Sequence, residues 1–294
     1  MRIFVTGADG FIGSNICYHL EKSGHDIVPL CSSTNLISDH FKNAVYRGMF
    51  GFPHEEILES CDGIVHMAAQ NDTTTKNRSE TFRLNYEESV MLYELGEKYN
   101  HKFFVYASTA AVYGAATEKI KETDLELPLN IYAESKLMFD KYVREKSLPC
   151  IGLRFCNVYG KNEEQKGRRK SYIRQMINDI SSNKNVKLFS DGSQRRDWVY
   201  VPDVCQAVEK SIHSKNYGIY NIGSGNSISF IDLFKFIKSC FKDSSSVIEW
   251  IHNPIKEQYQ NFTELNVSLA RKKINFVPEY DIYKGVANYI REIK

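Results

Sequence analysis

Short apolar runs and longer amphipathic stretches alternate along the first half of the chain. Amphipathic stretches, in which apolar positions recur about every 3.6 residues, are typical of helices, and short runs rich in β-branched and aromatic residues are typical of strands. Helical spacing is clearest at 11–23 and 79–99. The short apolar runs lie at 2–6, 26–30, 44–47, 63–69 and 103–108. The pattern therefore predicts strands and helices in alternation.

Strands that alternate with helices at this spacing form right-handed crossover units, in which the strands run parallel. We expect an α/β fold with a doubly wound parallel sheet, the Rossmann fold, and a smaller C-terminal lobe. The run at 103–108 is interpreted as an apolar strand at the buried centre of that sheet.

A glycine-rich turn, Gly7-Ala8-Asp9-Gly10-Phe11-Ile12-Gly13, separates the first strand from the first helix. Its three glycines permit a tight turn, close approach of a pyrophosphate to backbone N–H groups, and close packing of helix on strand. The helix N-terminus favours negative charge. Three spaced glycines alone are more often an ordinary turn, but this strand–turn–helix context predicts a dinucleotide site. The predicted cofactor contacts in the turn are Gly7, Gly10, Phe11, Ile12 and Gly13.

Two further segments bear on the cofactor. A protein that binds NAD usually ends its second strand with a carboxylate against the adenosine ribose, but here that place is taken by Cys31-Ser32-Ser33-Thr34. Loss of the acid removes a repulsion against a 2′-phosphate, and hydroxyls such as that of Ser32 can donate to one. No arginine follows closely, so NAD and NADP both stay open, with NADP mildly favoured. At the end of the fourth strand, small residues including Ala68 would let the backbone approach the cofactor.

These positions divide the chain into two parts. We assign 1–160 to a dinucleotide-binding domain, to which 197–222 returns. Residues 161–196 and 223–294 are assigned to the substrate lobe.

Composition narrows the function classes. The chain has 294 residues, of which 42% are hydrophobic, and a formal net charge of +2, so nothing points to a nucleic acid or a membrane as partner. No segment approaches the ~20 uninterrupted apolar residues of a membrane span, and no signal peptide is expected. The seven cysteines form no CxxC pair or Cys/His cluster. We therefore expect no metal site, no disulfide framework and a cytoplasmic location.

Candidate chemistry lies in the helical segment that contains Tyr132 and Lys136. Residues four apart share one face of a helix. With an effective dielectric of ~20 and a separation of ~4 Å, the attraction of the ammonium for a phenolate reaches ~4 kcal/mol as an upper bound. Such a tyrosine can remove and return the proton of an alcohol. Spacing alone does not select this pair, because Tyr18…Lys22 and Tyr142…Lys146 share it.

The three Tyr…Lys pairs differ in their positions in the predicted fold. Ligands of a doubly wound sheet bind beyond the carboxyl ends of its strands, and Ser108 and Thr109 lie at that end of the fifth strand. A hydroxyl there can meet the helix that carries Tyr132 and Lys136, although a Ser-Thr pair alone is more often a strand-terminating turn. Tyr142 is about 280° around the helix from Tyr132 and faces elsewhere.

Motifs spread over nearly the whole chain resemble one family. They are Thr6-Gly7…Gly10…Gly13, His66-Met67-Ala68-Ala69, the stretch from Ala107 to Gly114, Tyr132…Lys136, the stretch from Leu153 to Gly160, and the stretch from Arg196 to Val204. In this order they resemble the extended short-chain dehydrogenase/reductases, specifically the NAD(P)-dependent nucleotide-sugar epimerase/dehydratase family.

The resemblance implies a role for each matching residue. Tyr132 would be the acid/base, Lys136 would lower its pKa and hold the nicotinamide ribose, and Thr109 would bind the reacting hydroxyl. The other implied substrate contacts are Ser108, as a supporting hydroxyl, Asn157, and Arg196 at a diphosphate or nucleotide.

Within the family the chain most resembles the ADP-glycero-manno-heptose 6-epimerases. The shared segments run from Tyr106 to Gly114, at Lys166-Gly167, at Lys187-Leu188-Phe189 and from Tyr259 to Thr263. That likeness implies that Lys166 is a second acid/base on the opposite face of the sugar. The alternative is that Lys166 belongs to a solvated charge run at 161–170. In that run, Arg168, Arg169 and Lys170 suit an acidic ligand such as a sugar nucleotide diphosphate.

The resemblance thus implies an epimerase of a nucleotide diphosphate sugar, with a heptose as one candidate, acting through transient oxidation to a ketone and re-reduction. Two alternatives stay open: a keto-reductase or dehydrogenase that exchanges its cofactor, and a non-catalytic dinucleotide-binding regulator. A dehydratase is disfavoured because Ala110-Ala111 follows Thr109, where dehydratases resemble Asp-Glu. The family's usual acid after the third strand is replaced by Gly48-Met49. A homodimer packed through 79–99 and 131–146 is also implied.

Overall fold

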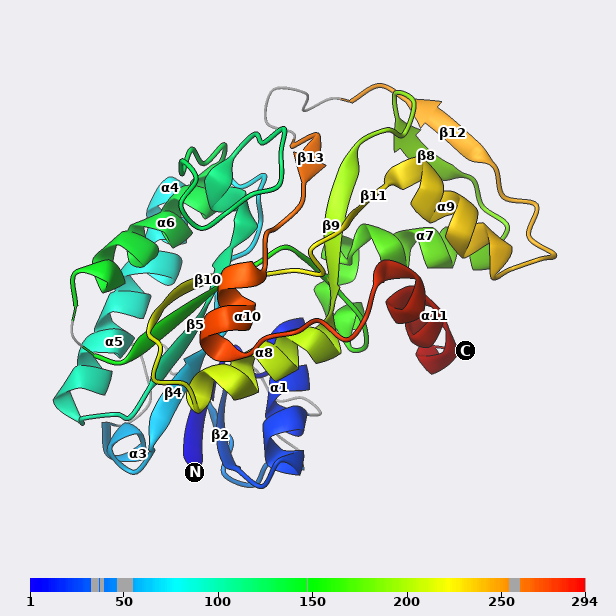
Figure 1. Cartoon of the computed structure of the whole chain (residues 1–294). Helices are drawn as coiled ribbons and strands as arrows, with labels where there is room; N and C mark the ends of the chain where they lie inside the picture. Colours follow the sequence, from blue (N-terminus) through cyan, green and yellow to red (C-terminus); the bar gives the residue numbers. More distant parts are fainter. Residues whose placement is uncertain (33–36, 38–39, 47–54, 147, 254–259, 294) are drawn as a thin grey trace.

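The computed structural model describes residues 1–32, 37, 40–46, 55–146, 148–253 and 260–293, without the side chains at 165 and 168. A seven-stranded sheet in the order β10-β6-β5-β4-β1-β2-β3 forms its centre (Figure 1). The strands are β1 (Arg2–Thr6), β2 (Asp26–Cys31), β3 (Val45–Tyr46), β4 (Gly63–His66), β5 (Phe104–Thr109), β6 (Cys150–Phe155) and β10 (Gly218–Ile222).

All neighbouring strands of this sheet run parallel. The chain goes outward from β1 to β2 and β3, then returns to β4 on the other side of β1, so the strand order reverses between β1 and β4. The predicted doubly wound sheet is confirmed. The fourth strand is shorter than predicted, because the chain leaves the sheet after His66.

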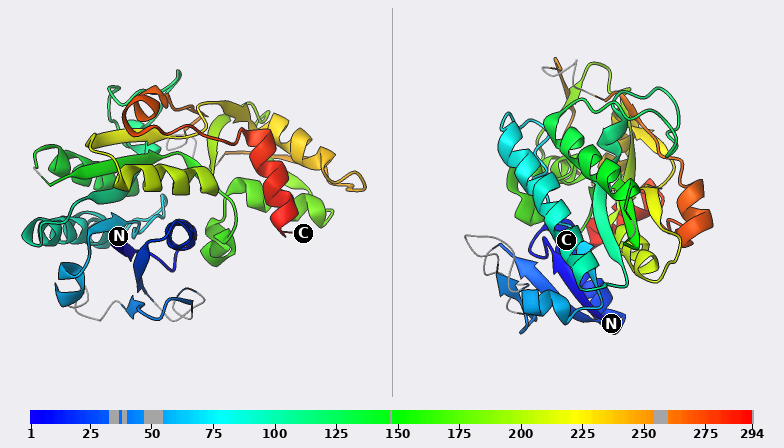
Figure 2. Two further views of the ribbon diagram at one scale, coloured as in Figure 1. Left: turned by 60° about the horizontal axis from the view of Figure 1, so that its bottom comes forward. Right: turned by 90° about the vertical axis from the view of Figure 1, so that its left-hand side faces the viewer.

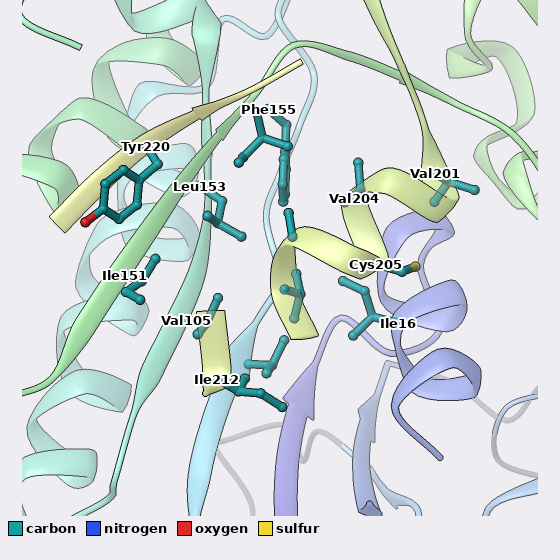
Figure 3. Close-up of a cluster of buried hydrophobic side chains, with 14 of the residues drawn as sticks. Ile16, Val105, Ile151, Leu153, Phe155, Val201, Val204, Cys205, Ile212 and Tyr220 are labelled. Atoms are coloured by element: carbon teal, nitrogen blue, oxygen red, sulfur yellow. The ribbon is translucent and has the colours of Figure 1, made fainter. Parts of the chain in front are cut away.

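Alternate residues of the strands face two different cores. On one face, side chains of β5 and β6 such as Val105 and Leu153 pack against helix α8 (Val201–Ile212), and helix α1 (Phe11–Lys22) packs beside α8, as Figure 3 shows. Helix α10 (Ser268–Ile274) completes this layer.

The opposite face is covered by α3 (Glu55–Glu59), α5 (Glu88–Lys98) and α6 (Ile131–Arg144), over a core that includes Phe104 and Phe139. Helices α5 and α6 lie side by side (Figure 2, right). Such alternation along each strand is the pattern expected of a sheet buried on both faces.

The long helix predicted at 79–99 contains an irregularity that its apolar pattern does not reveal. It consists of α4 (Arg78–Phe82), a π-helical segment η1 (Arg83–Glu87) and α5. Asn77 caps its start, with its side chain accepting a hydrogen bond from the backbone of Glu80. The wider π turn changes which side chains face the sheet.

A smaller lobe follows, with its own core. In it, β9 (Arg195–Tyr200) lies between β11 (Ser227–Ser229) and β13 (Phe262–Thr263) and also pairs with β7 (Asn157–Tyr159). A two-stranded sheet joins β8 (Val186–Phe189) to β12 (Ile248–Ile251). The helices of this lobe are α7 (Tyr172–Ser181), α9 (Phe230–Ser239) and α11 (Ile282–Ile293).

The lobes interleave more than the sequence suggests. Strand β9, which runs into the return segment 197–222, pairs within the smaller lobe, whereas β10 of that segment joins the main sheet and α8 packs on that sheet. Helix α10, in the segment assigned to the substrate lobe, packs against α8 and β10. Figure 2 shows α10 close to the large sheet in two further views.

Three simple features of the described residues constrain function. None of their helices combines the length and the apolar character that a membrane crossing requires. They contain no group of three or more His, Cys, Asp or Glu side chains placed to hold a metal ion. All seven cysteines lie in this part of the chain and are free.

Candidate active site

A cleft of about 1700 Å³ runs along the carboxyl ends of the central strands and reaches into the smaller lobe. Residues from the β1–α1 turn, from the ends of β4, β5 and β6, and from α7, β8 and β9 line it. The predicted site residues that line this cleft are Gly7, Gly10, Phe11, Ile12, Gly13, Ser32, Ala68, Ser108, Thr109, Tyr132, Asn157, Lys166 and Arg196. Lys136 is buried in α6.

Close backbone packing shapes the glycine turn. Gly7 has a φ of 64°, and a Cβ there would lie 2.7 Å from the backbone nitrogen of Ala68. A Cβ on Gly13 would lie 2.0 Å from the carbonyl oxygen of Gly7. Helix α1 starts at Phe11, and its N-cap residue Gly10 offers no side chain to the first N–H groups. These N–H groups and the helix dipole fit the pyrophosphate of a dinucleotide.

Tyr132 and Thr109 come together where β5 ends and α6 begins. Asn130 fixes the start of α6, since its Oδ1 accepts a hydrogen bond of 2.9 Å from the backbone nitrogen of Ala133. The Thr109 hydroxyl accepts one of 3.2 Å from the backbone nitrogen of Ala111, and it lies close enough to the Tyr132 phenol to lower the pKa of that phenol. A strand-end hydroxyl therefore contacts the proposed acid/base, as expected from the sequence.

The pKa of Tyr132 moves in the opposite direction to that expected. Burial raises it, the neighbouring Thr109 hydroxyl lowers it, and the charge of Asp140 raises it. The spacing to Lys136 predicts a lowered pKa, but the cost of burying a phenolate dominates.

Lys136 is a buried ammonium, with 1% of the residue exposed. Burial lowers its pKa to about 8, against the opposing effect of Asp140. Within the described part of the chain, its Nζ has no hydrogen-bond partner. An unpaired buried cation is costly, so the site fits a ligand that brings oxygen acceptors. The ribose hydroxyls of a nicotinamide dinucleotide are such acceptors.

Asp140 was not selected from the sequence, although it follows Lys136 at helical spacing. It is fully buried and accepts hydrogen bonds from Tyr106 at 2.8 Å, from Ser108 at 3.0 Å, and from Nε of Arg154 at 2.9 Å. Ser108 therefore donates its hydroxyl proton to Asp140 of α6. Toward the cleft, the Ser108 oxygen can only accept a hydrogen bond. Asp140 ties the ends of β5 and β6 to the helix that carries Tyr132.

Asn85, in the π-helical segment, is a second residue that the sequence did not indicate. Its Nδ2 donates to the Gln70 carbonyl at 2.9 Å and to the Ser135 hydroxyl at 3.0 Å, while its Oδ1 accepts from the backbone nitrogen of Gln70. Ser135 in turn donates to the carbonyl of Tyr132. Asn85 thus joins the segment after β4 to the turn of α6 between Tyr132 and Lys136.

His66 is buried next to the part of the cleft that contains the glycine turn. Its Nδ1 is 2.7 Å from the Thr6 hydroxyl, and its Nε2 is 2.9 Å from the Ser89 hydroxyl. Burial, with a further contribution from the charge of Lys136, lowers the pKa of His66 to about 3, so the ring is neutral. Thr6 also accepts a hydrogen bond from the backbone of Ala68, which holds that backbone beside Gly7.

Lys166 reaches the cleft from the short helix η3 (Glu163–Arg169), which packs against α1. It is partly buried rather than fully solvated, and its ammonium lies 5.3 Å from the centre of the Phe11 ring. Burial lowers its pKa, while Glu163 raises it and Arg169 lowers it. Lys166 and Tyr132 line the same cleft, with Lys166 next to the glycine turn.

Two other basic residues of the charge run, Arg169 and Lys170, have protein partners. Arg169 donates to the side-chain oxygen of Asn71 at 2.9 Å, and Lys170 pairs with Glu164. The side chain of Arg168 lies outside the described residues.

The smaller lobe contributes cationic and aromatic groups to the far end of the cleft. The guanidinium of Arg196 lies 5.7 Å from the centre of the Phe230 ring and donates to the Arg195 carbonyl at 2.9 Å. Asn157 donates to the carbonyl of Asp197 at 2.9 Å, which fixes its amide at the cleft wall. Other lining residues there are Tyr172, Lys184, Lys187, Phe189, Gln194 and Gln260. This end suits a ligand with anionic and planar parts.

Several segments that the sequence singled out lie outside the described residues. They are Ser33 and Thr34 after the second strand, Gly48-Met49 after the third, and Tyr259 near the C-terminus.

Comparison with known proteins gives consistent results. Residues 3–223 match the model of the NAD dependent epimerase/dehydratase family. An ADP-L-glycero-D-manno-heptose-6-epimerase from Alkalilimnicola ehrlichii is 31% identical, over 98% of this chain and 96% of the relative. The crystal structure of the Helicobacter pylori ADP-L-glycero-D-manno-heptose-6-epimerase is 29% identical, with a TM-score of 0.87 over 99% of this chain and 96% of that one. A UDP-glucose 4-epimerase from Thermotoga maritima, solved with UDP-glucose, is 25% identical, with a TM-score of 0.87 over 100% and 99%.

Proposed function

Because this chain belongs to the NAD dependent epimerase/dehydratase family, we propose that it is an NAD(P)-dependent epimerase of a nucleotide diphosphate sugar. We favour a heptose as the sugar, since relatives named ADP-L-glycero-D-manno-heptose-6-epimerase align over nearly the full length. One observation carries the proposal: the hydroxyl groups of Thr109 and Tyr132 line one cleft with an uncapped glycine turn. Lys136, whose Nζ has no hydrogen-bond partner among the described residues, lies on the same helix as Tyr132.

The residues have distinct tasks in this reaction. The glycine turn and Lys136 would hold a nicotinamide dinucleotide, which would supply reversible hydride transfer at the reacting carbon of the sugar. Thr109 holds the reacting hydroxyl, and Tyr132 takes its proton as the ketone forms. The positive charge of Lys136, on the same helix as Tyr132, favours this transfer once ligand oxygens share the cost of burying it.

Epimerisation also needs a proton carrier for the opposite face of the sugar, and we assign this task to Lys166. It lines the same cleft, and burial lowers its pKa, which eases proton transfer near neutral pH. Gly167, which follows it, has a φ of 55°, in the left-handed region that favours glycine.

The far end of the cleft is assigned to the nucleotide diphosphate. Arg196 provides a cation, and Tyr172 and Phe189 provide aromatic surface. Guanidinium groups match phosphate oxygens, and aromatic rings stack on bases.

We further propose a homodimer packed through α5 and α6. The two helices lie side by side, and each carries an exposed large apolar side chain, Met91 with 40% and Met138 with 39% of the residue exposed. Light scattering on purified protein tests this: a mass equal to that of one chain would exclude the dimer.

The function is tested by incubating purified protein with ADP-linked heptoses and with UDP-linked hexoses. Product stereochemistry is followed by NMR, and cofactor reduction by absorbance near ~340 nm. An inverted centre without net change of the cofactor is the expected result. Stoichiometric consumption of cofactor would identify the keto-reductase or dehydrogenase instead. If a folded, cofactor-loaded sample turns over no nucleotide sugar, the proposal is wrong.

A further inference from the structure

A fully buried carboxylate closes the loop that carries Lys166. Glu163, the first residue of η3, has none of its surface exposed. Its Oε1 accepts hydrogen bonds from the backbone nitrogen of Gly160 at 3.2 Å and from the Ser171 hydroxyl at 3.0 Å, and its Oε2 accepts one of 2.5 Å from the backbone nitrogen of Ser171. Gly160 directly follows β7, and Ser171 caps α7. One side chain therefore holds together both ends of the loop 160–171.

These hydrogen bonds favour the closed loop strongly. Burying a carboxylate is costly unless it is hydrogen-bonded, and hydrogen bonds to an ionised acceptor are roughly twice as strong as those between neutral groups. The Glu163 carboxylate therefore disfavours any arrangement in which Gly160 and Ser171 separate. Lys166 lies near the middle of this loop, so its place in the cleft depends on the closure.

The closed loop is also tied to the wall of the cleft. Nδ2 of Asn15, in α1, donates to the Lys161 carbonyl at 2.8 Å, and Arg169 donates at 2.9 Å to a side-chain oxygen of the segment after β4. Between these two anchors, the ammonium of Lys166 lies over the ring of Phe11, at the start of α1. The loop thus places Lys166 against the helix that begins at the glycine turn.

Glu163 also acts on the charge of Lys166. Burial, the largest effect, lowers the pKa of Lys166, whereas Glu163 raises it and Arg169 lowers it. From α1, which packs against η3, Lys166 is faced by the uncharged ring of Phe11. In the proposed reaction Lys166 gives a proton to the ketone oxygen when the ketone is reduced again, so it must enter this step as an ammonium. The Glu163 charge favours that form.

On the basis of the function proposed above, we propose that Glu163 is a positioning residue for Lys166. It closes the loop and so fixes the place of the ammonium in the cleft, and its negative charge stabilises the ammonium that burial disfavours. Glu163 therefore acts on the second half of epimerisation. The first oxidation, which uses Thr109 and Tyr132, does not depend on it.

The neighbouring carboxylate supplies a matched control. Glu164 is exposed, and it pairs with Lys170 and with Arg174 of α7. Glu164→Gln removes the same charge one residue along the same loop and leaves the hydrogen bonds of Glu163 in place. Glu163→Gln removes the buried charge and keeps a side chain of the same size.

The titration of Lys166 is measured on the full-length protein without turnover. Trace acetylation with acetic anhydride over a range of pH, read by mass spectrometry of the peptide that contains Lys166, reports the free amine. We expect Glu163→Gln to lower the pKa of Lys166 below that of the wild type, because it removes the charge that raises it. Glu164→Gln should leave this pKa close to that of the wild type, because solvent screens exposed charges. Equal titration of Lys166 in the wild type and Glu163→Gln overturns the inference.

Hydrogen exchange of the wild type tests the closure of the loop by itself. The backbone N–H groups of Gly160 and Ser171 lie outside helices and strands, yet both should exchange about 10²-fold more slowly than unstructured amides, or slower still. Glu163→Gln should speed both by about tenfold or more. The wild-type measurement stands even if Glu163→Gln does not fold, and exchange of both amides at the unstructured rate contradicts the closure.

Turnover separates the role of Glu163 from the function on which it rests. In Glu163→Gln, epimerisation should fall by about tenfold or more, while the first oxidation, followed near ~340 nm in a single turnover, stays close to that of the wild type. Normal epimerisation by folded Glu163→Gln overturns the inference and leaves the proposed function standing. If the folded wild type epimerises no nucleotide sugar, both the proposed function and the role of Glu163 in it are wrong.

Discussion

The Thr109 hydroxyl, at the last residue of β5, lies beside Tyr132 in the first turn of α6 and lowers the pKa of its phenol. Tyr132→Phe removes the proton carrier and leaves the ring in place. Turnover should fall by about 10²-fold or more, with coenzyme binding close to that of the wild type, as measured by steady-state assay and calorimetry.

Tyr142→Phe is the matched control. Tyr142 has the same spacing to a lysine, but its phenol donates to Glu94 of α5. We expect near-normal activity from it. Wild-type turnover in Tyr132→Phe would remove Tyr132 from the mechanism.

Lys136 should be necessary for function and costly for stability. Burial lowers its pKa to about 8, whereas in the unfolded chain it titrates near ~10.4. Below about pH 8 the folded protein therefore carries a cost on the order of 3 kcal/mol. Lys136→Met should remove this cost and raise the free energy of unfolding of coenzyme-free protein at pH 7, while abolishing turnover.

The pH dependence gives this prediction a definite sign. Between about pH 8 and ~10.4 the unfolded chain binds more protons than the folded one. The wild type should therefore gain stability relative to Lys136→Met as the pH rises through this window. Urea unfolding at several pH values measures it, with Lys141→Met, at an exposed position of the same helix, as the control. A pH-independent difference would contradict the buried-ammonium assignment.

Asp140 should affect both the stability of the protein and the pKa of Lys136. Asp140→Asn leaves Arg154, which is also fully buried, with one partner fewer, and breaking a buried pair in this way costs roughly 3–5 kcal/mol. It should also lower the pKa of Lys136 further, because the Asp140 charge raises it. Thermal unfolding and the pH profile of coenzyme binding report the two effects separately.

A surface pair provides the comparison. Glu134 lies on the same helix as Asp140 and pairs with Arg78. Glu134→Gln breaks this pair, and exposed pairs contribute little to stability. Equal loss of stability in Glu134→Gln and Asp140→Asn would show that burial of the Asp140–Arg154 pair is unimportant.

Gly13→Ala tests the close packing of the glycine turn. Alanine is favoured over glycine inside a helix by about 1 kcal/mol, yet its Cβ would lie 2.0 Å from the Gly7 carbonyl oxygen. We expect a shifted turn and loss of dinucleotide binding by about 100-fold. Gly96→Ala in α5, where the nearest atom at 3.2 Å belongs to the flexible side chain of Leu148, should bind normally. Normal binding by Gly13→Ala would show that the turn is not the pyrophosphate site.

The features that sequence predicts here are those with a local physical cause. The strand–glycine–helix order of residues 2–23 follows from the apolar pattern and from backbone freedom, and both are visible in a short window. Thr109 and Tyr132 could be brought together because the strand ends of a parallel sheet meet at one edge.

The sequence alone does not show which distant side chains come into contact on folding, or how deeply each becomes buried. Asp9 belongs to the first turn, yet it contacts Ser32 of the second strand. Asn85 reaches Ser135 from a π turn that the helical spacing does not indicate. The pKa of Tyr132 depends on its burial, which no spacing argument supplies.

Lys166 decides between epimerisation and simple redox chemistry. If Lys166 carries the proton on the second face of the sugar, Lys166→Met should still permit removal of the first hydrogen but not its return with inverted geometry. We expect loss of epimerisation by about 10²-fold or more, with a rise in absorbance near ~340 nm that decays slowly.

Lys161→Met, at an exposed lysine of the same charge run, should epimerise normally. Because Lys166 lies over Phe11 in the free protein, coenzyme binding is measured in parallel. Normal epimerisation by Lys166→Met would return Lys166 to the role of a charged residue beside the glycine turn.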